Sequence, residues 1–566
     1  MPTEEIQSNP FKENEPANVG LRLRGVAAAR PHQPAVIEVG TNPTQEAVRQ
    51  VSFEELDRHS DRIAAGFRKM GIPAGSRLVL AIRPGIDFVT TVVAMLKARL
   101  VMVLIDPGMP KRHLIPCLSD SKPDGFVAIP RVHLIRLLFR RKFPQSRFHI
   151  VAGNATWLGN ILGEISLDAL KQDTSATIPD EQLSLDDPAA VIFTTGSTGP
   201  PKGVFYSHLQ FARQIEEIRD RFDLQPGAVD LAAFPLFGLF NCMMGITTVF
   251  PAMNYTRPAT ADPKRIAATI KRWNVTQSFG SPAFWNTVAT YCDETDESLA
   301  PLKRVFSSGA PVPNHVLRRL LKRLDEGSDI QTPYGATEAL PVASIGASEV
   351  LSETAAQSEQ GKGTCVGARF PGINWQVIKV SDSAITSIES VVELPRGEIG
   401  ELMVQGDVVT REYVTGTDAN ALHKVADGNR IWHRMGDVGY LDEQDRFWFC
   451  GRKAHRVTTL DGVLYTVPCE AIFNRHPRIY RSALVGVGPL ETRRPVMIVE
   501  TWPDHQPKNT ADWNSLKQEL LDLAQQFTHT KSIINVLWRL RLPTDIRHNA
   551  KIFREQLAPW AARQLS

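Results

Sequence analysis

The sequence lacks the features that would point to a membrane-spanning, secreted or nucleic-acid-binding protein. No uninterrupted apolar run reaches the roughly 18 to 20 residues that a membrane span needs. The six cysteines are scattered, without a Cys-x-x-Cys pair or a histidine at ligand spacing, so we interpret them as reduced and structural. A net charge of +3 is too small to predict a nucleic-acid partner. Residues 1–19 are typical of neither a signal peptide nor a transit sequence, so we expect a cytoplasmic location.

The composition and rhythm of the chain are those of an α/β protein with more than one domain. Its 566 residues, 43% hydrophobic and 22% charged, are enough for several cores. Strand-like and helix-like segments alternate between residues 77 and 105, which predicts a parallel sheet covered by helices. Short β segments with turns follow from Gly397 to Phe449. We therefore predict an N-terminal domain, residues 1–450, with a β-rich subdomain, and a small, mobile α+β C-terminal domain, residues 451–566.

Local patterns predict where some helices and loops lie. Ser52 followed by Glu55 makes a capping box, and Asp262-Pro263 is a favourable helix start. The stretch from Ala347 to Gly363, rich in Ser, Glu, Gln and Gly, predicts a mobile loop. These signals are local and say nothing yet about function.

The stretch Phe193 to Gly203, Phe-Thr-Thr-Gly-Ser-Thr-Gly-Pro-Pro-Lys-Gly, has the make-up of a loop that binds a polyphosphate. Its glycines can adopt left-handed conformations that turn successive N–H groups toward one anion. The polar and glycine positions are Thr194, Thr195, Gly196, Ser197, Thr198, Gly199 and Lys202. Pro201 excludes a Walker A loop, which needs glycine there. An ordinary Ser/Gly turn is the alternative.

A basic and apolar segment runs from Arg131 to Lys142. As a helix, it would carry Val132, Ile135, Leu138 and Phe139 along one side and its arginines largely elsewhere. We interpret it as a surface helix packed on the core. Contact with a membrane surface or a partner protein is the alternative.

Further motifs follow in a fixed order, and together they are far more specific than any one of them. They are Gly309-Ala310-Pro311, Tyr334-Gly335-Ala336-Thr337-Glu338, Trp432-His-Arg-Met-Gly-Asp437, Gly451-Arg452 and the late Lys551. With the loop at 193–203, they make nearly the whole chain resemble the adenylate-forming superfamily of acyl-CoA synthetases, peptide-synthetase adenylation domains and luciferases. That resemblance implies ATP and Mg²⁺ as cofactors and a carboxylic acid as the other substrate.

The resemblance also implies how the nucleotide is held. Tyr334 would stack on adenine while the backbone from Gly309 to Pro311 closes on the base edge. Thr337 would donate a hydrogen bond to the α-phosphate. Glu338 would supply an oxygen to Mg²⁺, which prefers hard oxygen ligands.

The same resemblance assigns the ribose contact and the main catalytic group. Asp437 would accept hydrogen bonds from the ribose hydroxyls, with Arg452 beside it. Lys551 would bridge the attacking carboxylate and the α-phosphate, offsetting the charge that builds up during displacement. In the superfamily, the C-terminal domain then rotates about a hinge for a second half-reaction.

The chain departs from the superfamily pattern around the hinge and the late lysine. Ala454 stands where an acidic residue is usual, the loop ending at Leu464 lacks the usual arginine, and His548-Asn549-Ala550-Lys551 replaces Ser-Gly-Lys. These departures most resemble the β-lactone synthetases of bacterial long-chain olefin biosynthesis. Adenylation is expected to be intact, whereas the second half-reaction is expected to differ.

That branch of the superfamily implies a reaction without CoA. The adenylate of a long-chain 2-alkyl-3-hydroxy acid would be attacked by its own β-hydroxyl, which gives a β-lactone and AMP. His208 and His455 are the candidate bases, although each can equally be a packing or surface residue. The apolar run from Phe234 to Phe240 would line the acyl pocket, or else belong to an ordinary core.

Two other functions stay open on the sequence alone. A long-chain fatty acyl-CoA synthetase differs only in what attacks the adenylate. A nucleotide-binding scaffold that has lost catalysis is a function of another class, against which the retained Glu338 and Lys551 argue. The partners implied by the resemblance are the long-chain β-hydroxy acid, a downstream β-lactone decarboxylase and an upstream reductase.

Overall fold

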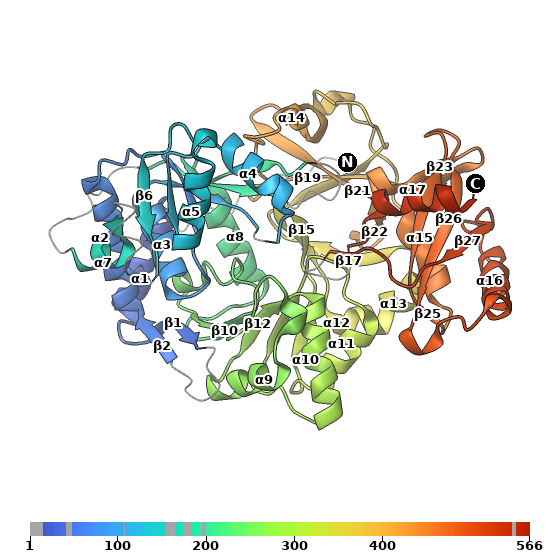
Figure 1. The fold of residues 1–566 in the computed structure, drawn as a ribbon, viewed down its shortest axis with the longest axis horizontal. Helices are drawn as coiled ribbons and strands as arrows, with labels where there is room; N and C mark the ends of the chain where they lie inside the picture. The colour runs from blue at the N-terminus through green and yellow to red at the C-terminus, as the bar shows by residue number, and fades with distance from the viewer. Residues whose placement is uncertain are drawn as a thin grey trace.

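The N-terminal part of the chain folds into two mainly parallel sheets flanked by helices (Figure 1). The computed structural model describes residues 15–40, 48–106, 108–153, 165–173, 183–194, 200–545 and 551–565. One seven-stranded sheet has the order β7 (Ile165–Ser166), β6 (Phe148–Val151), β5 (Gly125–Ala128), β3 (Arg77–Ala81), β4 (Val101–Leu104), β8 (Pro188–Phe193), β9 (Gly203–Ser207). The predicted α/β class is confirmed.

The second seven-stranded sheet is built the same way, with parallel pairs and one antiparallel edge strand. Its order is β14 (Asp329–Gln331), β13 (Arg304–Ser307), β12 (Gln277–Gly280), β10 (Val229–Ala232), β11 (Thr247–Phe250), β1 (Pro34–Val39), β2 (Val48–Ser52). In both sheets the interior strands read as short apolar runs, because both faces are covered.

A third, antiparallel sheet forms the predicted β-rich subdomain. Its strands are β15 (Tyr334–Ala336), β16 (Ala339–Ser344), β17 (Thr364–Arg369), β22 (Arg446–Arg452), β21 (Arg430–Leu441), β19 (Gly400–Gln405) and β18 (Asn374–Ile378), with β20 (Lys424–Asp427) paired to β21. The predicted nucleotide residues Tyr334, Asp437 and Arg452 therefore share one sheet.

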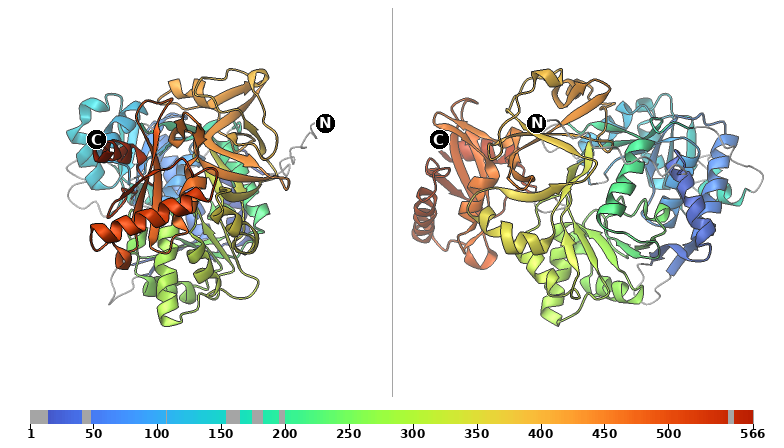
Figure 2. Two further views of the ribbon diagram at one scale, coloured as in Figure 1. Left: turned by 90° about the vertical axis from the view of Figure 1, so that its right-hand side faces the viewer. Right: turned by 180° about the vertical axis from the view of Figure 1, so that it is seen from behind.

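The C-terminal residues fold against the end of this third sheet (Figure 2). They form the hairpin β23 (Val457–Thr459) and β24 (Gly462–Leu464), and a sheet of β25 (Ile479–Val487), β26 (Arg494–Thr501) and β27 (Asn535–Trp538). Their own apolar cluster runs from Val457 to Val536. Because β22 extends to Arg452, the antiparallel sheet ends just beyond Gly451. The division after residue 450 stays a prediction.

Helices cover the sheets and begin where local chemistry predicts. The α-helices are α1 (Arg22–Ala29), α2 (Phe53–Lys69), α3 (Ile86–Lys97), α4 (Lys111–Asp120), α5 (Pro130–Leu138), α7 (Leu167–Gln172), α8 (His208–Arg221), α9 (Pro263–Arg272), α10 (Pro282–Thr295), α11 (Asn314–Leu321), α12 (Ala347–Glu349), α13 (Ala355–Glu359), α14 (Asp418–His423), α15 (Thr466–Asn474), α16 (Thr510–Gln525) and α17 (Arg554–Leu565). Ser52 and Glu55 form the predicted capping box, and Asp262 caps α9. No helix in the described part of the chain is long and apolar enough to cross a membrane.

The prediction of which side of α5 faces the core was only partly right: Val132 and Ile135 are half-buried, but the other two residues of the predicted side are not. Leu138 and Phe139 are exposed, whereas His133 and Arg136 are buried. Polar contacts of these two side chains with β6 decide the orientation, and a periodicity argument based on apolar residues cannot anticipate them.

The predicted loop between Ala347 and Gly363 is mostly helical. It contains α12, one π-helical turn, η5 (Val350–Thr354), and α13. Ala347, Thr354 and Ala355 are buried, so tertiary packing stabilises helical turns that the local composition does not favour.

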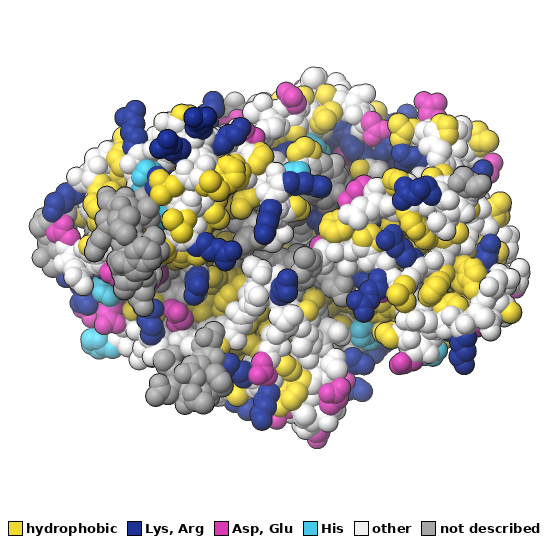
Figure 3. Space-filling model, viewed as in Figure 1, with side chains coloured by type: hydrophobic (Ala, Val, Ile, Leu, Met, Phe, Trp, Pro, Cys, Tyr) yellow, Lys and Arg dark blue, Asp and Glu magenta, His cyan; other side chains and the backbone are white. Residues whose placement is uncertain are grey.

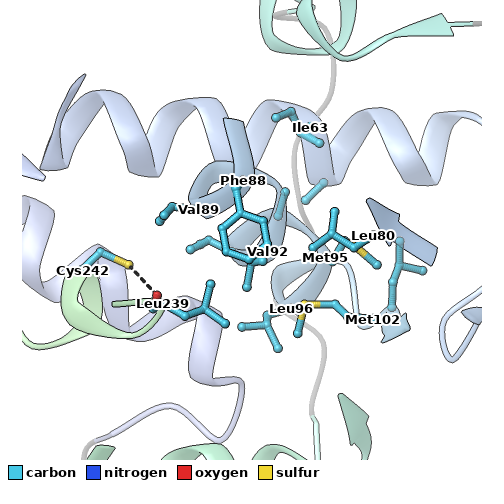
Figure 4. Packing of buried hydrophobic residues seen from close by; sticks show 14 of the residues in the cluster. Ile63, Leu80, Phe88, Val89, Val92, Met95, Leu96, Met102, Leu239 and Cys242 are labelled. Carbon is cyan, nitrogen blue, oxygen red and sulfur yellow. Dashed lines mark hydrogen bonds between the residues drawn. The ribbon is translucent and has the colours of Figure 1, made fainter. Parts of the chain in front are cut away.

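The main core lies between the two parallel sheets. Figure 4 shows part of this core. Ile63 of α2 and Phe88 of α3 belong to the same cluster as Leu239 and Cys242, which lie between β10 and β11 of the second sheet. Residues of β1, β4, β8 and α8 belong to the same cluster. This packing joins the sheets and sets the positions of β8 and β9, the strands on either side of the predicted phosphate loop.

Candidate active site

The site is centred on Glu338, in the turn between β15 and β16. Its Oε1 accepts a hydrogen bond of 2.7 Å from the Tyr413 hydroxyl. The carbonyl of Thr337 accepts one of 2.5 Å from the hydroxyl of Tyr206, on β9. Both turn residues are half-buried. Two tyrosines thus hold the turn while Thr337 and Glu338 keep polar groups accessible.

Four cationic side chains surround Glu338. Burial lowers the pKa of Lys202, Lys424 and Lys551, to about 7 for Lys424, and the charge of Glu338 opposes this effect. Asp437 raises the pKa of Arg452, to which Glu338 also contributes. These cations come from parts of the chain between residues 202 and 551. Their convergence makes an electropositive site that suits a polyphosphate.

Asp437 is a buried carboxylate on β21 facing two other predicted site residues. The Tyr334 hydroxyl donates a hydrogen bond of 2.5 Å to Oδ2, and Nη1 of Arg452 lies 2.9 Å from Oδ1. Burial raises the pKa of Asp437, and Arg452 opposes the rise. Within the described residues, no donor with hydrogen-bond geometry reaches Oδ1. Oδ1 is itself buried beside the Arg452 guanidinium, so the contact of Asp437 with a ribose stays a prediction.

The two ends of the predicted phosphate loop are held together. Thr194 N–H donates to the carbonyl of Lys202 at 2.9 Å, and Lys202 N–H donates to Thr194 Oγ1 at 3.1 Å. The Lys202 ammonium lies 4.8 Å from the centre of the Tyr413 ring, which connects the loop with Glu338. The loop residues Thr195, Gly196, Ser197, Thr198 and Gly199 lie outside the described residues, so their predicted role stays a prediction.

The predicted adenine-binding segments lie next to each other. The turn from Gly309 to Pro311 follows β13, and Gly309 has a φ of 93°, which favours glycine. Just before it, the Ser308 hydroxyl donates to the carbonyl of Pro333 at 2.7 Å. This bond ties Gly309, Ala310 and Pro311 to the strand that carries Tyr334, Gly335 and Ala336.

Lys551 and His455 enter the site from the C-terminal part of the chain. Besides burial, the charges of Arg452, Asp437 and Glu338 act on the pKa of Lys551, so the lysine lies near all three groups. Burial, together with the charges of Arg554, Arg452 and Lys551, lowers the pKa of His455 to about 3. His455 is therefore neutral at pH 7 and lies beside the predicted catalytic lysine.

The structure places His208 away from this group, which corrects its choice as a candidate base. Its ring is fully buried, and Nδ1 accepts a hydrogen bond of 3.3 Å from the backbone of Val19. Burial lowers its pKa to about 4, and its charged neighbours are Asp187 and Arg99 rather than Glu338. His208 is a packing residue at the start of α8.

The hinge region has ion pairs on both sides of Ala454, the position where the superfamily usually has an acidic residue. Ala454 is exposed. On its N-terminal side, Lys453 Nζ lies 2.9 Å from Oε1 of the fully buried Glu401, whose Oε2 lies 2.6 Å from Arg434. On its C-terminal side, Arg456 pairs with Asp382.

Comparison with known proteins places this site in a family. The family model described as "AMP-binding enzyme" matches residues 23–414. The chain belongs to the AMP-binding enzyme family. Its relatives include the olefin β-lactone synthetase of Xanthomonas campestris pv. campestris, 41% identical over 97% of this chain and 98% of that protein. The protein of the same name from Stenotrophomonas maltophilia is 38% identical, over 98% and 99%.

Solved structures share the fold of this AMP-binding enzyme. ATP-bound MatB from Rhodopseudomonas palustris is 20% identical, with a TM-score of 0.75 over 98% of this chain and 100% of that one. The amide bond synthetase McbA from Marinactinospora thermotolerans is 18% identical, with a TM-score of 0.76 over 96% and 100%. The resemblance to the adenylate-forming superfamily is confirmed.

The residues of this AMP-binding enzyme fit both ATP and Mg²⁺. The cations around Glu338 suit a triphosphate, and Asp437 lies beside Tyr334 and Arg452, where the predicted ribose contact would be. Glu338 can give Mg²⁺ one carboxylate oxygen while Tyr413 holds the other, and phosphate oxygens would complete the shell. In the described residues no group of three or more His, Cys, Asp or Glu side chains could hold a metal ion.

Sequence reasoning missed three residues that this AMP-binding enzyme brings to Glu338. Tyr413 binds its carboxylate, Lys424 binds the carbonyl and the hydroxyl of Thr410, and His423 lies 3.4 Å from the Lys202 ammonium. They lie in or beside short β segments without a recognisable motif. Their contacts with Glu338, Thr410 and Lys202 can be recognised only once the fold has brought these side chains together.

Proposed function

We propose that this AMP-binding enzyme is an olefin β-lactone synthetase that acts on long-chain 2-alkyl-3-hydroxy acids. The structural observation that supports adenylation is Lys551 beside Glu338, Asp437 and Arg452. The choice of branch rests on the two relatives of that name, each similar over nearly its full length. The exposed Ala454 in the hinge agrees with that choice.

The first step joins the acid to AMP. A carboxylate oxygen attacks the α-phosphorus, the bond to the β-phosphate oxygen breaks, and pyrophosphate leaves. Lys551 offsets the charge shared by the attacking carboxylate and the α-phosphate, while Lys202 and Thr337 hold phosphate oxygens. Mg²⁺ bound through Glu338 would neutralise further phosphate charge.

The second step closes the ring within the bound adenylate. The β-hydroxyl oxygen attacks the acyl carbon, the bond from that carbon to the AMP oxygen breaks, and the hydroxyl proton passes to a base. Holding the hydroxyl against the carbonyl makes this attack unimolecular, which compensates for the strain of a four-membered ring.

His455 is the base that the site supports. It lies near Lys551 and is neutral, so its ring carries an acceptor nitrogen at pH 7. The cations Arg554, Arg452 and Lys551 make it a weak base before substrate binds. The anionic acyl-adenylate would offset those charges and raise its pKa toward the operating pH.

The proposed substrate and partners follow from the lactone product. Phe234 and Phe237 lie against Phe279, and we propose this aromatic group as part of the acyl pocket. A β-lactone with long alkyl chains is poorly soluble, so we propose transfer to a downstream β-lactone decarboxylase, with a reductase supplying the hydroxy acid. A cytoplasmic location stays a prediction.

Product mass with and without CoA tests the proposal. The full-length protein is mixed with ATP, Mg²⁺ and a long-chain 2-alkyl-3-hydroxy acid. A CoA-independent product equal to the acid minus water is expected. A thioester formed only with CoA would mean an acyl-CoA synthetase, and tight ATP binding without pyrophosphate release from any acid would mean an inactive scaffold.

A further inference from the structure

Helix α5 turns its three leucines outward, and Phe139 directly after it is exposed as well. The exposed fractions are 46% for Leu134, 40% for Leu137, 79% for Leu138 and 39% for Phe139. A surface helix of a globular protein normally buries its apolar stripe. Four large apolar side chains within six consecutive residues instead face water.

Specific polar contacts hold α5 in this orientation. Nε2 of the buried His133 lies 3.0 Å from the carbonyl oxygen of Ile150 on β6. Arg136 Nη1 lies 2.9 Å from Nε2 of His149, on the same strand. Burial lowers the pKa of both histidines to about 4, so they are neutral and His149 can accept from the guanidinium. The outward leucines are thus part of a defined arrangement.

Cations surround the apolar face, and acids are absent from this part of the sequence. Arg131, Arg140, Arg141 and Lys142 are exposed, the last three in η2 (Arg140–Lys142), directly after α5. No Asp or Glu occurs between Asp124 and Glu164. In Figure 3, hydrophobic side chains gather over α5 and α4, next to a group of Lys and Arg side chains.

We infer that α5 and η2 form a docking surface for an anionic lipid bilayer. The leucines and Phe139 would enter the boundary between headgroups and acyl chains, and the cations would lie at the lipid phosphates. Leucines with only basic neighbours are typical of a helix that lies in the membrane interface. Protein interfaces are enriched in Tyr, Trp and Met as well as in Phe and Arg, and residues 130–142 contain none of the first three.

Co-sedimentation with vesicles tests the docking surface on the full-length protein. Binding is expected to vesicles of phosphatidylcholine with 30% phosphatidylglycerol and to weaken as NaCl rises from 50 to 300 mM, since salt screens the lipid charge. Binding to pure phosphatidylcholine is expected to be at least about tenfold weaker. Absence of binding to the anionic vesicles would overturn the inference.

Variants separate the apolar and the charged contributions. The triple substitution Leu134→Gln, Leu137→Gln, Leu138→Gln is expected to reduce anionic-vesicle binding at least about tenfold. Each neutralised cation, as in Arg140→Gln or Lys142→Gln, is expected to reduce it about fivefold. Leu490→Gln with Ile534→Gln, at exposed apolar positions of the C-terminal part, is the matched control. An apolar variant that binds like the wild type would contradict the surface chosen.

A fluorescent label shows whether α5 itself enters the lipid, and it leaves the other exposed apolar side chains in place. All six native cysteines are buried, so Leu138→Cys can be labelled selectively with a polarity-sensitive dye. We expect its emission to shift to shorter wavelength when anionic vesicles are added. An unchanged emission from vesicle-bound protein would overturn the inference. A shift that needs no vesicles and grows with protein concentration would assign the face to a second copy of the chain.

Discussion

At the residue scale, the proposed chemistry of this enzyme depends on a few charged groups around Glu338. Lys551 comes from the C-terminal part of the chain, and burial lowers its pKa while Asp437 and Glu338 favour its charged form. A positive charge at this point counts most when charge develops on the α-phosphate, because a group already in place then stabilises that charge without rearrangement.

We expect Lys551→Ala to reduce acyl-adenylate formation by about 10²- to 10³-fold, the usual effect of removing one charge-stabilising group. ATP affinity is expected to change only a few-fold, since Lys202, Arg452 and Asp437 stay in place. ATP–pyrophosphate exchange and calorimetric titration with ATP measure the two quantities. Lys531→Ala, at an exposed lysine of the C-terminal part, is the control. An unaffected exchange rate would mean that another lysine is catalytic.

The hydroxyl of Tyr413 is expected to position Glu338 for Mg²⁺. Tyr413→Phe removes the 2.7 Å hydrogen bond to the carboxylate. A hydrogen bond to a charged group contributes about 1.5 to 3 kcal/mol, so the Mg²⁺ concentration for half-maximal rate is expected to rise roughly tenfold or more. Tyr440→Phe, which removes a hydroxyl bonded to the carbonyl of Lys362 in the same sheet, is the control. Equal Mg²⁺ dependence of both variants would disprove the positioning role.

At the element scale, the strand β19 holds the start of the hinge through a buried carboxylate. Glu401 is fully buried between Arg434 of β21 and Lys453 of η7 (Lys453–His455), at 2.6 Å and 2.9 Å. Lys453 also donates to the carbonyl of Ser381 at 3.0 Å. The segment before Ala454 is therefore attached to the antiparallel sheet, and any rotation of the C-terminal part must begin after it.

Glu401→Gln should destabilise the enzyme markedly. The substitution leaves Arg434 and Lys453 buried without their counter-charge, a situation that costs about 3 to 5 kcal/mol. Urea denaturation followed by tryptophan fluorescence measures the free energy of unfolding. Glu398→Gln, an exposed acid in the turn before the same strand, is the control and should have little effect. A loss below about 1 kcal/mol would show that the buried group is not an ion cluster.

At the scale of the whole molecule, the pH dependence of stability includes a contribution from a buried carboxyl group, that of Asp230. Asp230, on β10, accepts a hydrogen bond of 2.9 Å from Asn241. Besides burial, only hydrogen bonds from Asn241 and Gln277 act on its pKa, and no cation does. Burial raises its pKa from 3.8 to about 7. Between these pH values the folded state keeps a proton that the unfolded state has lost.

Asp230 is therefore expected to lower the free energy of unfolding as the pH rises from about 4 to 7, by at most roughly 1.4 kcal/mol per pH unit. Asp230→Asn removes this effect, so the difference between variant and wild type should grow in favour of the variant over that range and level off above it. Denaturation at pH 5, 6, 7 and 8 measures the difference. Exposed Asp461→Asn, a titration control, should show no such trend.

Much of the fold could be predicted because local rules decided it. The capping box at Ser52 and Glu55 and the cap at Asp262 lie within a few residues of sequence, and the structure contains both. The alternation of strand and helix between residues 77 and 105 likewise predicted a parallel sheet. Local rules failed for α5 and for residues 347–363, where buried polar or alanine contacts from other elements outweighed the local pattern.

By itself, the sequence determined the fold class, the order of the nucleotide motifs and the resemblance to an adenylate-forming superfamily, because these depend on residue type and spacing. Only the tertiary structure decided that Tyr413, Lys424 and His423 meet at Glu338, that His455 lies beside Lys551 while His208 does not, and that α5 faces its leucines outward. Such contacts join residues far apart in the chain. They form because buried polar groups need hydrogen-bond partners, and those partners cannot be predicted from one stretch of sequence.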